Sequence, residues 1–179
     1  MKVQAAISVL EGIVGTLNID TNQSAADWLQ MVKYLLRTEA FRDLDDIQVQ
    51  ILNDIDDTGV AITDATHLIA CLGEMNSTIA TDTAGWFGAA DADSDTIELG
   101  AAALPDDVIF VNHIRDVATT GVSEYYPMIF LAGAAGTAGG AAYGRTGITL
   151  DTGLTFWADG DGGNDIATDG MDCVVVYRN

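Results

Sequence analysis

The chain has 179 residues, 49% of them hydrophobic, and a formal net charge of −20 from 27 acidic residues against 7 Lys and Arg. This hydrophobic content is enough for a packed core, which excludes a disordered chain. The negative charge opposes contact with nucleic-acid phosphates and with anionic membrane surfaces, so neither is expected as a direct partner. It also keeps copies of the chain apart, and close packing between them requires apolar contacts, salt screening or bound cations.

The N-terminal region, residues 1–79, is predicted to be helical. Apolar residues recur at helical spacing from Val3 to Val14, and Gly15 would end this first helix. A second helix begins at Ser24, where Asp27 replaces the Glu or Gln of a capping box. One face of this helix carries large apolar side chains, which predict a core-facing stripe, with a partner-binding stripe as the alternative. These residues are Trp28, Met31, Val32, Leu35 and Leu36, of which Trp28, Met31 and Leu35 are the expected contact residues if the stripe binds a partner.

Two further helices are predicted before residue 79. From Asp43 to Asp57, acidic residues are mixed with apolar ones spaced by three or four positions, which indicates an amphipathic helix. The apolar residues are Leu44, Ile47, Ile51 and Ile55. After a turn at residues 56–59, Thr63 or Asp64 would cap a short fourth helix that runs through Leu72 and ends at Gly73. Four short helices in this region predict a compact bundle or a helical arm.

Residues 80–95 are predicted to be a linker because they are mostly small and polar. Trp86 and Phe87 are large aromatic exceptions within it. They would either pack beneath the adjoining sheet or anchor the chain on another protein.

Residues 96–179 are predicted to form an antiparallel β-sandwich of the jelly-roll kind. Six short runs rich in β-branched and aromatic residues are separated by Gly, Asp and Thr turns. Pro127 would interrupt a central ladder, so its strand begins after it or lies at an edge, whereas the C-terminal run is expected inside a sheet. The runs are 96–99, 108–114, 125–131, 147–150, 154–157 and 173–177. The expected fold class is therefore α+β, with short N-terminal helices followed by this sandwich.

A Gly/Ala stretch from Ala132 to Gly144 is predicted to be a long loop, because it has too little side chain to pack as a strand. Glycine permits close backbone approach, so the loop would lie flat against a neighbouring subunit or surface, with a plain flexible loop as the alternative. The contact residues expected in it are Gly133, Gly136, Gly139, Gly140 and Tyr143.

Clusters of Asp invite a calcium interpretation, because calcium needs several hard oxygen ligands at one point. The candidates are Asp54 to Asp57, Asp91 to Asp95, and a third cluster that includes Asp159, Asp161 and Asp165. Neither of the last two clusters has the Gly and Glu of an EF-hand loop at the required positions. Asp159, Asp161 and Asp165 remain candidate Ca²⁺ ligands, with solvated turns as the alternative, and no other cofactor is expected.

Catalytic patterns are missing from the sequence, so an enzyme is not expected. His67 and His113 are the only histidines, and no nucleophile-elbow, zincin or phosphate-loop motif is present. Cys71 is expected in a helix and Cys173 at the start of a strand, and both are interpreted as buried thiols, with a disulfide left open. The sequence has no signal-peptide pattern and no apolar run of about 18 residues, which predicts a soluble protein made in the cytoplasm.

The chain resembles the small virion proteins of tailed bacteriophages. The resemblance covers mainly residues 95–179 and lies in the Gly/Ala/Thr-rich middle and in a strand-dense C-terminal half that closes on Thr155–Trp157 and Asp172–Arg178. The most similar group is the capsid decoration (cement) proteins with a jelly-roll body. The resemblance implies a non-enzymatic homotrimer on the capsid exterior, bound to the major capsid protein or other virion proteins. The N-terminal helices depart from the short extended arm of many cement proteins, which leaves a tail, neck or host-binding role open.

The alternative is a carbohydrate- or host-surface-binding β-sandwich module of a phage tail or head fibre. Such modules bind sugars on exposed aromatic side chains, often beside calcium. The aromatic candidates are Trp86, Tyr125, Tyr126, Tyr143 and Trp157. A weaker alternative, an acid-pair hydrolase, has many carboxylates to choose from but no spacing that selects a pair.

Overall fold

The computed structural model describes residues 1–15, 23–55, 59–75, 85–91, 108–115, 131–132, 138–143, 147–160 and 171–179. Two helices come first, α1 (Val3–Val14) and α2 (Gln23–Leu36). The strands follow as β1 (Ile47–Ile55), β2 (Val60–Ile62), β3 (His67–Met75), β4 (Gly85–Ala90), β5 (Val108–Arg115), β6 (Leu131–Ala132), β7 (Ala138–Ala142), β8 (Ile148–Thr149), β9 (Leu154–Gly160) and β10 (Met171–Arg178).

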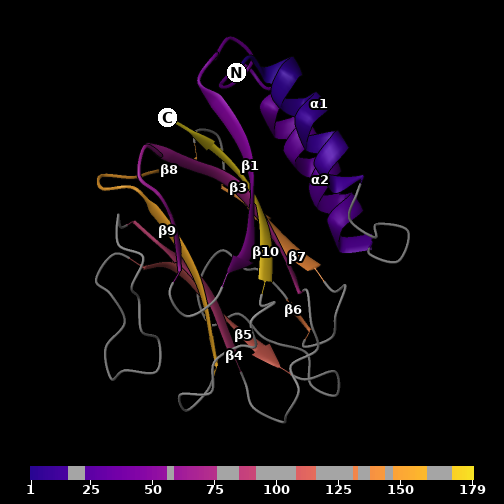
Figure 1. Ribbon diagram of the computed structural model, residues 1–179. Helices are drawn as coiled ribbons and strands as arrows, with labels where there is room; N and C mark the ends of the chain where they lie inside the picture. The colour runs from indigo at the N-terminus through magenta and orange to yellow at the C-terminus, as the bar shows by residue number, and fades with distance from the viewer. Residues whose placement is uncertain are drawn as a thin grey trace.

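The described strands form two sheets that pack as a sandwich. The middle sheet has the order β1-β10-β3-β7, with β8 also paired to β3, and the outer sheet has the order β2-β9-β4-β5-β6. Every described pairing is antiparallel except that of β5 with β6. Figure 1 shows the two helices side by side against one face of the middle sheet. The fold is therefore α+β, two N-terminal helices followed by an antiparallel sandwich, which confirms the predicted fold class.

The interior between the sheets is filled by side chains from both. Leu68 and Val175 of the middle sheet share one cluster of buried residues with Leu154 and Phe156 of the outer sheet. The alternation of side chains along a strand sends every second residue of β10 to this cluster. These β10 residues are Cys173, Val175 and Tyr177.

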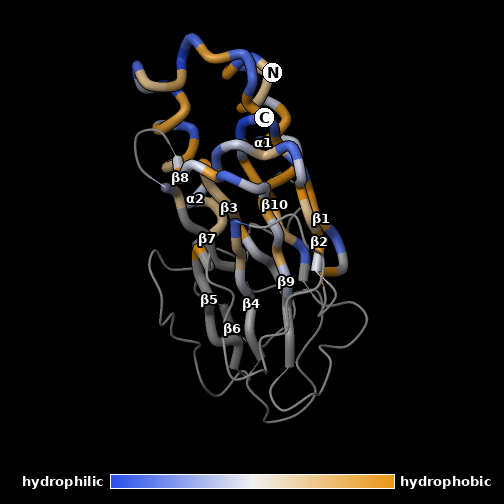
Figure 2. The backbone as a smooth tube through the Cα atoms, turned by 90° about the vertical axis from the view of Figure 1, so that its left-hand side faces the viewer, coloured by the Kyte–Doolittle hydropathy of each residue, from blue (hydrophilic) through white to orange (hydrophobic). Residues whose placement is uncertain are grey.

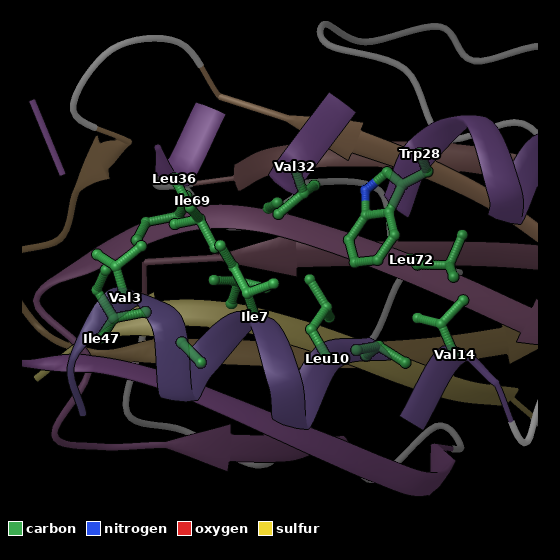
Figure 3. Packing of buried hydrophobic residues seen from close by; sticks show 14 of the residues in the cluster. Val3, Ile7, Leu10, Val14, Trp28, Val32, Leu36, Ile47, Ile69 and Leu72 are labelled. Carbon is green, nitrogen blue, oxygen red and sulfur yellow. The ribbon is translucent and has the colours of Figure 1, made fainter. Parts of the chain in front are cut away.

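A second core joins the helices to the other face of the middle sheet. Val174 and Val176 of β10 belong to it, so β10 is buried on both faces. Figure 3 shows the apolar face of α1 and Trp28 of α2 directed towards Ile69 and Leu72 of β3. The helix residues in this core are Val3, Ala6, Ile7, Leu10 and Val14 from α1 and Ala25, Trp28, Val32 and Leu36 from α2. Both helices were predicted from the periodicity of their apolar residues, and both are confirmed. In Figure 2 the hydrophobic colour alternates with the hydrophilic colour along the two helices.

The third and fourth predicted helices are wrong, because residues 47–55 form β1 and residues 67–75 form β3. In β1, Ile47 and Ile51 are four residues apart, a spacing that suits a helix but is also two full periods of a strand. In β3, the continuous apolar run from Leu68 to Leu72 has no strand alternation because both faces of the strand are buried. The strands of residues 47–75 thus lie in the same two sheets as those of the C-terminal half.

The predicted linker and the predicted Gly/Ala loop each contain a strand. Residues 85–90 form β4, in the outer sheet between β9 and β5, and residues 138–142 form β7, paired with β3. The small residues of these two segments predicted a linker and a loop. Cross-strand backbone hydrogen bonds do not depend on side-chain size, however, and small residues suit a strand that lies beneath a helix. Contacts join α2 to β7, which places this strand under the helix.

The other predicted strands have mixed outcomes. The runs at 108–114, 147–150, 154–157 and 173–177 correspond to β5, β8, β9 and β10 and are confirmed. The C-terminal run lies between β1 and β3, inside a sheet as expected. The predicted run at 96–99 and Pro127 lie outside the described residues, and only Leu131 of the run at 125–131 is described, as the first residue of β6.

A β-bulge in β3 sets which side chains face each core. Val176 pairs with Ala70 and Tyr177 pairs with Leu68, so Ile69 is an extra residue in the ladder. The extra residue lets Leu68 enter the interior core while Ile69 and Ala70 both join the helix core. Gly147 packs against this bulge with φ of +80°, and a Cβ added there would lie 2.6 Å from the carbonyl oxygen of Leu68.

Candidate functional site

Large apolar side chains are exposed on the outer side of α2. Tyr34 is 77% exposed and Met31 is 46% exposed, and Leu35 is half-buried at the border of the helix core. Residues three and four apart on a helix are neighbours, so these three side chains lie on one side of α2. We call Met31, Tyr34 and Leu35 the α2 flank.

The α2 flank faces away from α1. On the other side of α2, the Lys33 ammonium pairs with the Glu11 carboxylate of α1. Met31 precedes Lys33 by two residues, which is about 160° around the helix. The Lys33 hydrogen bond and then its charge lower the pKa of Glu11, with a smaller contribution from Arg37. The ion pair therefore holds the two helices together on the side opposite Met31.

The two helices contact opposite ends of the described middle sheet. Contacts join α2 to β7 and β3, whereas α1 contacts β1 at the other end of the middle sheet. In Figure 2 the label of α2 lies beside β7 and β8, and β1 lies on the far side of the sheet. Among the described strands, β7 stands at the end of the sheet order. Tyr34 is two residues from both Val32 and Leu36 of the helix core, so its side chain points away from the middle sheet.

The structure separates the residues that were expected to share a contact stripe on α2. Trp28 is only 2% exposed and packs in the helix core, so it is not available to a partner. Trp28 lies on the same face of α2 as Val32 and Leu36. It is buried because this face packs against the middle sheet. Met31, another of the expected contact residues, is exposed. Tyr34, which the sequence reasoning missed, could have been noticed as a large aromatic three residues after Met31 and outside the apolar face.

The other expected contact residues lie in or beside strands. Trp86 and Phe87 are in β4, where they pair with His113 and Asn112 of β5 and with Asp159 and Ala158 of β9. Gly139 and Gly140 are in β7 opposite Gly73 and Leu72. Gly133 and Gly136 lie outside the described residues.

Tyr143 is buried, not exposed, and lies beside the two cysteines. Its N–H donates to the carbonyl oxygen of Ile69 at 2.8 Å, and its hydroxyl is 3.9 Å from the Sγ of Cys71. Cys71 and Cys173 are both free and buried. Cys71 lies in β3, so its predicted helical setting is wrong, while the prediction of two buried thiols is confirmed. Burial raises the pKa of Cys173 and of Tyr143 well above their ordinary values, and the neighbouring Cys71 adds to both shifts.

The candidate calcium ligands are not brought together within the described residues. Asp159 lies in β9 opposite Trp86, and Asp161 and Asp165 lie outside the described part of the chain. No group of three or more His, Cys, Asp or Glu side chains in the described ranges is placed to hold a metal ion.

Asp91, the first residue of another Asp cluster, organises a turn. Its carboxylate accepts backbone N–H groups from Asp151 at 2.7 Å, Thr152 at 2.9 Å and Gly153 at 3.2 Å. Partial burial raises the pKa of Asp91, but these three hydrogen bonds outweigh burial and the net shift is downward. The end of β4 is thereby fixed to the turn that precedes β9.

The two histidines occupy strands. His67 begins β3 opposite Arg178, whose guanidinium donates to the Asp46 carboxylate through Nε and Nη2 at 2.7 to 3.1 Å. Burial and the Arg178 charge lower the pKa of His67, against a smaller opposite effect of Asp46. His113 lies in β5 opposite Trp86. The Asp46, His67 and Arg178 side chains thus form a charged cluster at one end of the middle sheet.

Comparison with protein-family models and with curated proteins finds no match for this chain. Among the described residues, neither α1 nor α2 has the length and hydrophobicity to cross a membrane. Of the aromatic residues considered for sugar binding, Trp157 and Tyr143 are buried, and Tyr125 and Tyr126 lie outside the described residues. The α2 flank is a described surface that exposes large apolar side chains.

Proposed function

We propose that this protein is a non-enzymatic structural protein of a virion, which binds and stabilises the exterior of a phage capsid as a decoration protein. The observation that carries the proposal is the α2 flank, where Tyr34 and Met31 expose large apolar surface on a chain with a net charge of −20. Aromatic residues and Met are enriched at protein interfaces. The proposed partners are the major capsid protein or other virion proteins.

The architecture supports this role by giving the flank a rigid base. Trp28, Val32 and Leu36 anchor the buried face of α2 on the middle sheet, so its exposed side chains are held on a fixed helix. A contact built on a rigid element loses less conformational entropy on binding than one built on a loop. Burial of a large apolar side chain contributes about 1.5–3 kcal/mol, so Met31 and Tyr34 would supply part of the binding free energy of a larger contact.

The acidic body supports the same role, because it favours one orientation on the particle. A chain with 27 acidic residues and a net charge of −20 is strongly hydrated and repels other copies, so its charged parts favour solvent over a second acidic surface. With the apolar flank against the shell, the acidic sandwich would face outward. The particle would then carry the protein as a solvent-facing layer.

The experiment uses purified virions that lack the protein, to which purified wild-type or variant protein is added. We expect Tyr34→Ser together with Met31→Ser to lower occupancy on the particle at least about tenfold, because the anchor loses its apolar area. The matched control is Val9→Ser on α1, which removes a similarly exposed apolar side chain from the other helix. Equal occupancy for the wild type and the double variant would refute the proposed role of the α2 flank.

A further inference from the structure

The net charge of the chain is distributed unevenly along its sequence. Residues 39–179 hold 24 acidic and 4 basic residues and so carry the whole charge of −20, whereas residues 1–38 hold three of each kind. The described part of residues 1–38 is the helix layer, in which α1 and α2 lie against one face of the middle sheet (Figure 1). An acidic partner can therefore approach the helix layer without net repulsion from it. The charged residues of this segment are Lys2, Lys33, Arg37, Glu11, Asp20 and Asp27.

Three exposed side chains form a ridge on the outer side of α2. Met31, Tyr34 and Arg37 follow one another at intervals of three residues, so each is a neighbour of the next on the helix surface. They are a Met, an aromatic residue and an Arg, which are the residue types enriched at protein interfaces. We call these three residues the α2 ridge. It shares Met31 and Tyr34 with the α2 flank and adds a positive charge.

The charge of Arg37 is available to a partner. Lys33 pairs with Glu11 of α1, and this pair is neutral as a whole. Arg37 is exposed and forms no ion pair with another described residue. Residues 28–38 contain no acidic residue. A partner that binds the α2 ridge therefore meets apolar surface beside one guanidinium group.

We propose that the α2 ridge binds an acidic protein surface, in which an apolar pocket receives Tyr34 and Met31 and a carboxylate pairs with Arg37. The inference rests on the proposed function, and it adds the chemistry of the shell surface that receives the helix. An amphipathic helix in an apolar groove is a common mode of protein recognition, and its anchors are spaced by three or four residues. A guanidinium can bind a carboxylate through two parallel hydrogen bonds, so Arg37 would also fix the direction of the helix on the shell.

Charge favours an acidic surface over a basic one as the partner of the α2 ridge. A basic surface is attracted by residues 39–179, which carry the charge of −20, and is repelled by Arg37. An acidic surface is repelled by residues 39–179 and attracted by Arg37. On an acidic shell these two forces act together, because they turn the helix layer towards the shell and the sandwich away from it.

Substitutions of Arg37 report the sign of the partner's charge. Wild-type and variant proteins are added to the purified virions that lack the protein, and the apparent dissociation constant is measured from the occupancy. We expect Arg37→Gln to weaken binding about tenfold and Arg37→Glu to weaken it further, with a smaller difference between the two at high salt. Equal binding of the two variants would indicate an uncharged partner surface, and tighter binding of Arg37→Glu would indicate a basic one. Either result would overturn the inference.

Lys2→Glu is the matched control for Arg37→Glu, because both substitutions change the net charge by the same amount. Lys2 is exposed at the N-cap of α1, outside the α2 ridge. We expect this variant to bind much like the wild type, and circular dichroism verifies that the helices of all variants are intact. An effect as large as that of Arg37→Glu would show that the total charge sets binding, and it would refute the contact at Arg37.

Chemical modification of the shell tests its charge without any change in this protein. Exposed carboxyl groups of the virions are converted to neutral amides with a carbodiimide and glycinamide, and exposed amines are acetylated in a parallel sample. We expect amidation to weaken binding at least about tenfold and acetylation to leave it unchanged, with intact particles verified by electron microscopy. Loss of binding on acetylation alone would reveal a basic partner and overturn the inference.

The remaining outcomes separate this inference from the proposed function. Particle binding that depends on Tyr34 and Met31, but not on Arg37 or on the carboxyl groups of the shell, would contradict only this inference. A wild-type protein that binds no particle would refute the proposed function and this inference with it. Vesicles of anionic phospholipid test for a membrane in place of a protein surface. Binding to these vesicles that depends on Arg37, without binding to virions, would overturn both.

Discussion

Asp91 accepts a hydrogen bond from the backbone N–H of Thr152 at 2.9 Å, although 61 residues separate the two in the sequence. The same carboxylate accepts the N–H groups on either side, from Asp151 and Gly153. Three successive N–H groups converge on one carboxylate, so this turn is an anion-binding concavity. Here the chain supplies its own anion, which fixes the end of β4 to the start of β9.

We expect Asp91→Ala to lower the free energy of unfolding by about 1–3 kcal/mol, because three backbone N–H groups lose a charged acceptor. Urea denaturation measures this change. The control is Asp151→Ala, which removes an exposed carboxylate from the same turn but leaves its N–H in place, and it should change stability by less than about 0.5 kcal/mol. Similar midpoints for the two variants would show that the Asp91 contacts do not stabilise the turn.

Alanine substitutions at two glycines should change the stability of the protein in opposite directions. Gly147→Ala should destabilise the protein, because φ is +80° and the added Cβ would lie 2.6 Å from the Leu68 carbonyl oxygen at the bulge. Gly12→Ala should stabilise it by about 0.5–1 kcal/mol, because the position is helical and nothing lies within 4 Å of the added Cβ. Thermal unfolding of both variants checks the signs. A neutral Gly147→Ala would disprove the close packing at the bulge.

The Asp46–Arg178 ion pair predicts a loss of stability in acid. The Arg178 hydrogen bonds, the largest effect, lower the pKa of Asp46 despite partial desolvation. The folded-state pKa of Asp46 lies below the unfolded value of about 3.9, so the ionised carboxylate stabilises the protein above about pH 3.9. This stabilisation is lost as the pH falls through the folded-state pKa. Asp46→Asn should therefore flatten the acid limb of a plot of stability against pH. A variant curve parallel to that of the wild type below pH 4 would contradict this.

His67 predicts a second effect at higher pH. Its lowered pKa means that the folded state binds the proton less well than the unfolded state, in which the pKa is about 6.5. Stability should therefore rise with pH between the folded pKa and about 6.5 and then remain level. His67→Gln should remove this slope. An NMR titration of the His67 ring gives the folded value directly, and a value above that of an unfolded control would reverse the expected sign.

The thiols of Cys71 and Cys173 should be inert in the folded protein. Both are buried and unpaired with each other, and burial favours the neutral thiol of Cys173 over the reactive thiolate. Their residues are offset in the ladder, with Cys173 opposite Gly73 and Cys71 opposite Val175. We expect a thiol reagent to modify neither cysteine until denaturant is added, and then to modify both. Modification of one thiol without loss of structure would show an opening that reaches the interior core.

The helices and the β10 strand were predictable because each carries a signal that its surroundings reinforce. The apolar residues of α1 repeat at helical spacing because only one face meets the sheet. The run from Val174 to Val176 is β-branched, which favours a strand even though both of its faces are buried. In these elements the local preference agrees with the tertiary setting.

The signals for β1 and β3 were ambiguous for a physical reason. The segment from Ile47 to Ile51 alternates apolar residues with Gln, which is a strand pattern, but the isoleucines four apart also fit a helix. The position of β3 between β10 and β7 is set by segments distant in the sequence, so it could not be predicted from the residues of β3 alone. The α2 flank was only partly predictable, because periodicity separates Tyr34 from the apolar face but does not reveal that Met31 lies outside the core.

The position of β10 constrains how the chain is made. The middle sheet places it between β1 and β3, which pair with β10 and not with one another, although β10 follows every other described strand in the sequence. While the ribosome is still producing residues 1–170, β1 and β3 have no central strand to join them, and the apolar face of the helices has no completed sheet to cover. Assembly of the middle sheet must therefore follow synthesis of residues 171–178, through contacts distant in sequence, which is a slow class of folding reaction. A truncation that removes β10 would leave β1 and β3 without the strand that joins them in one sheet.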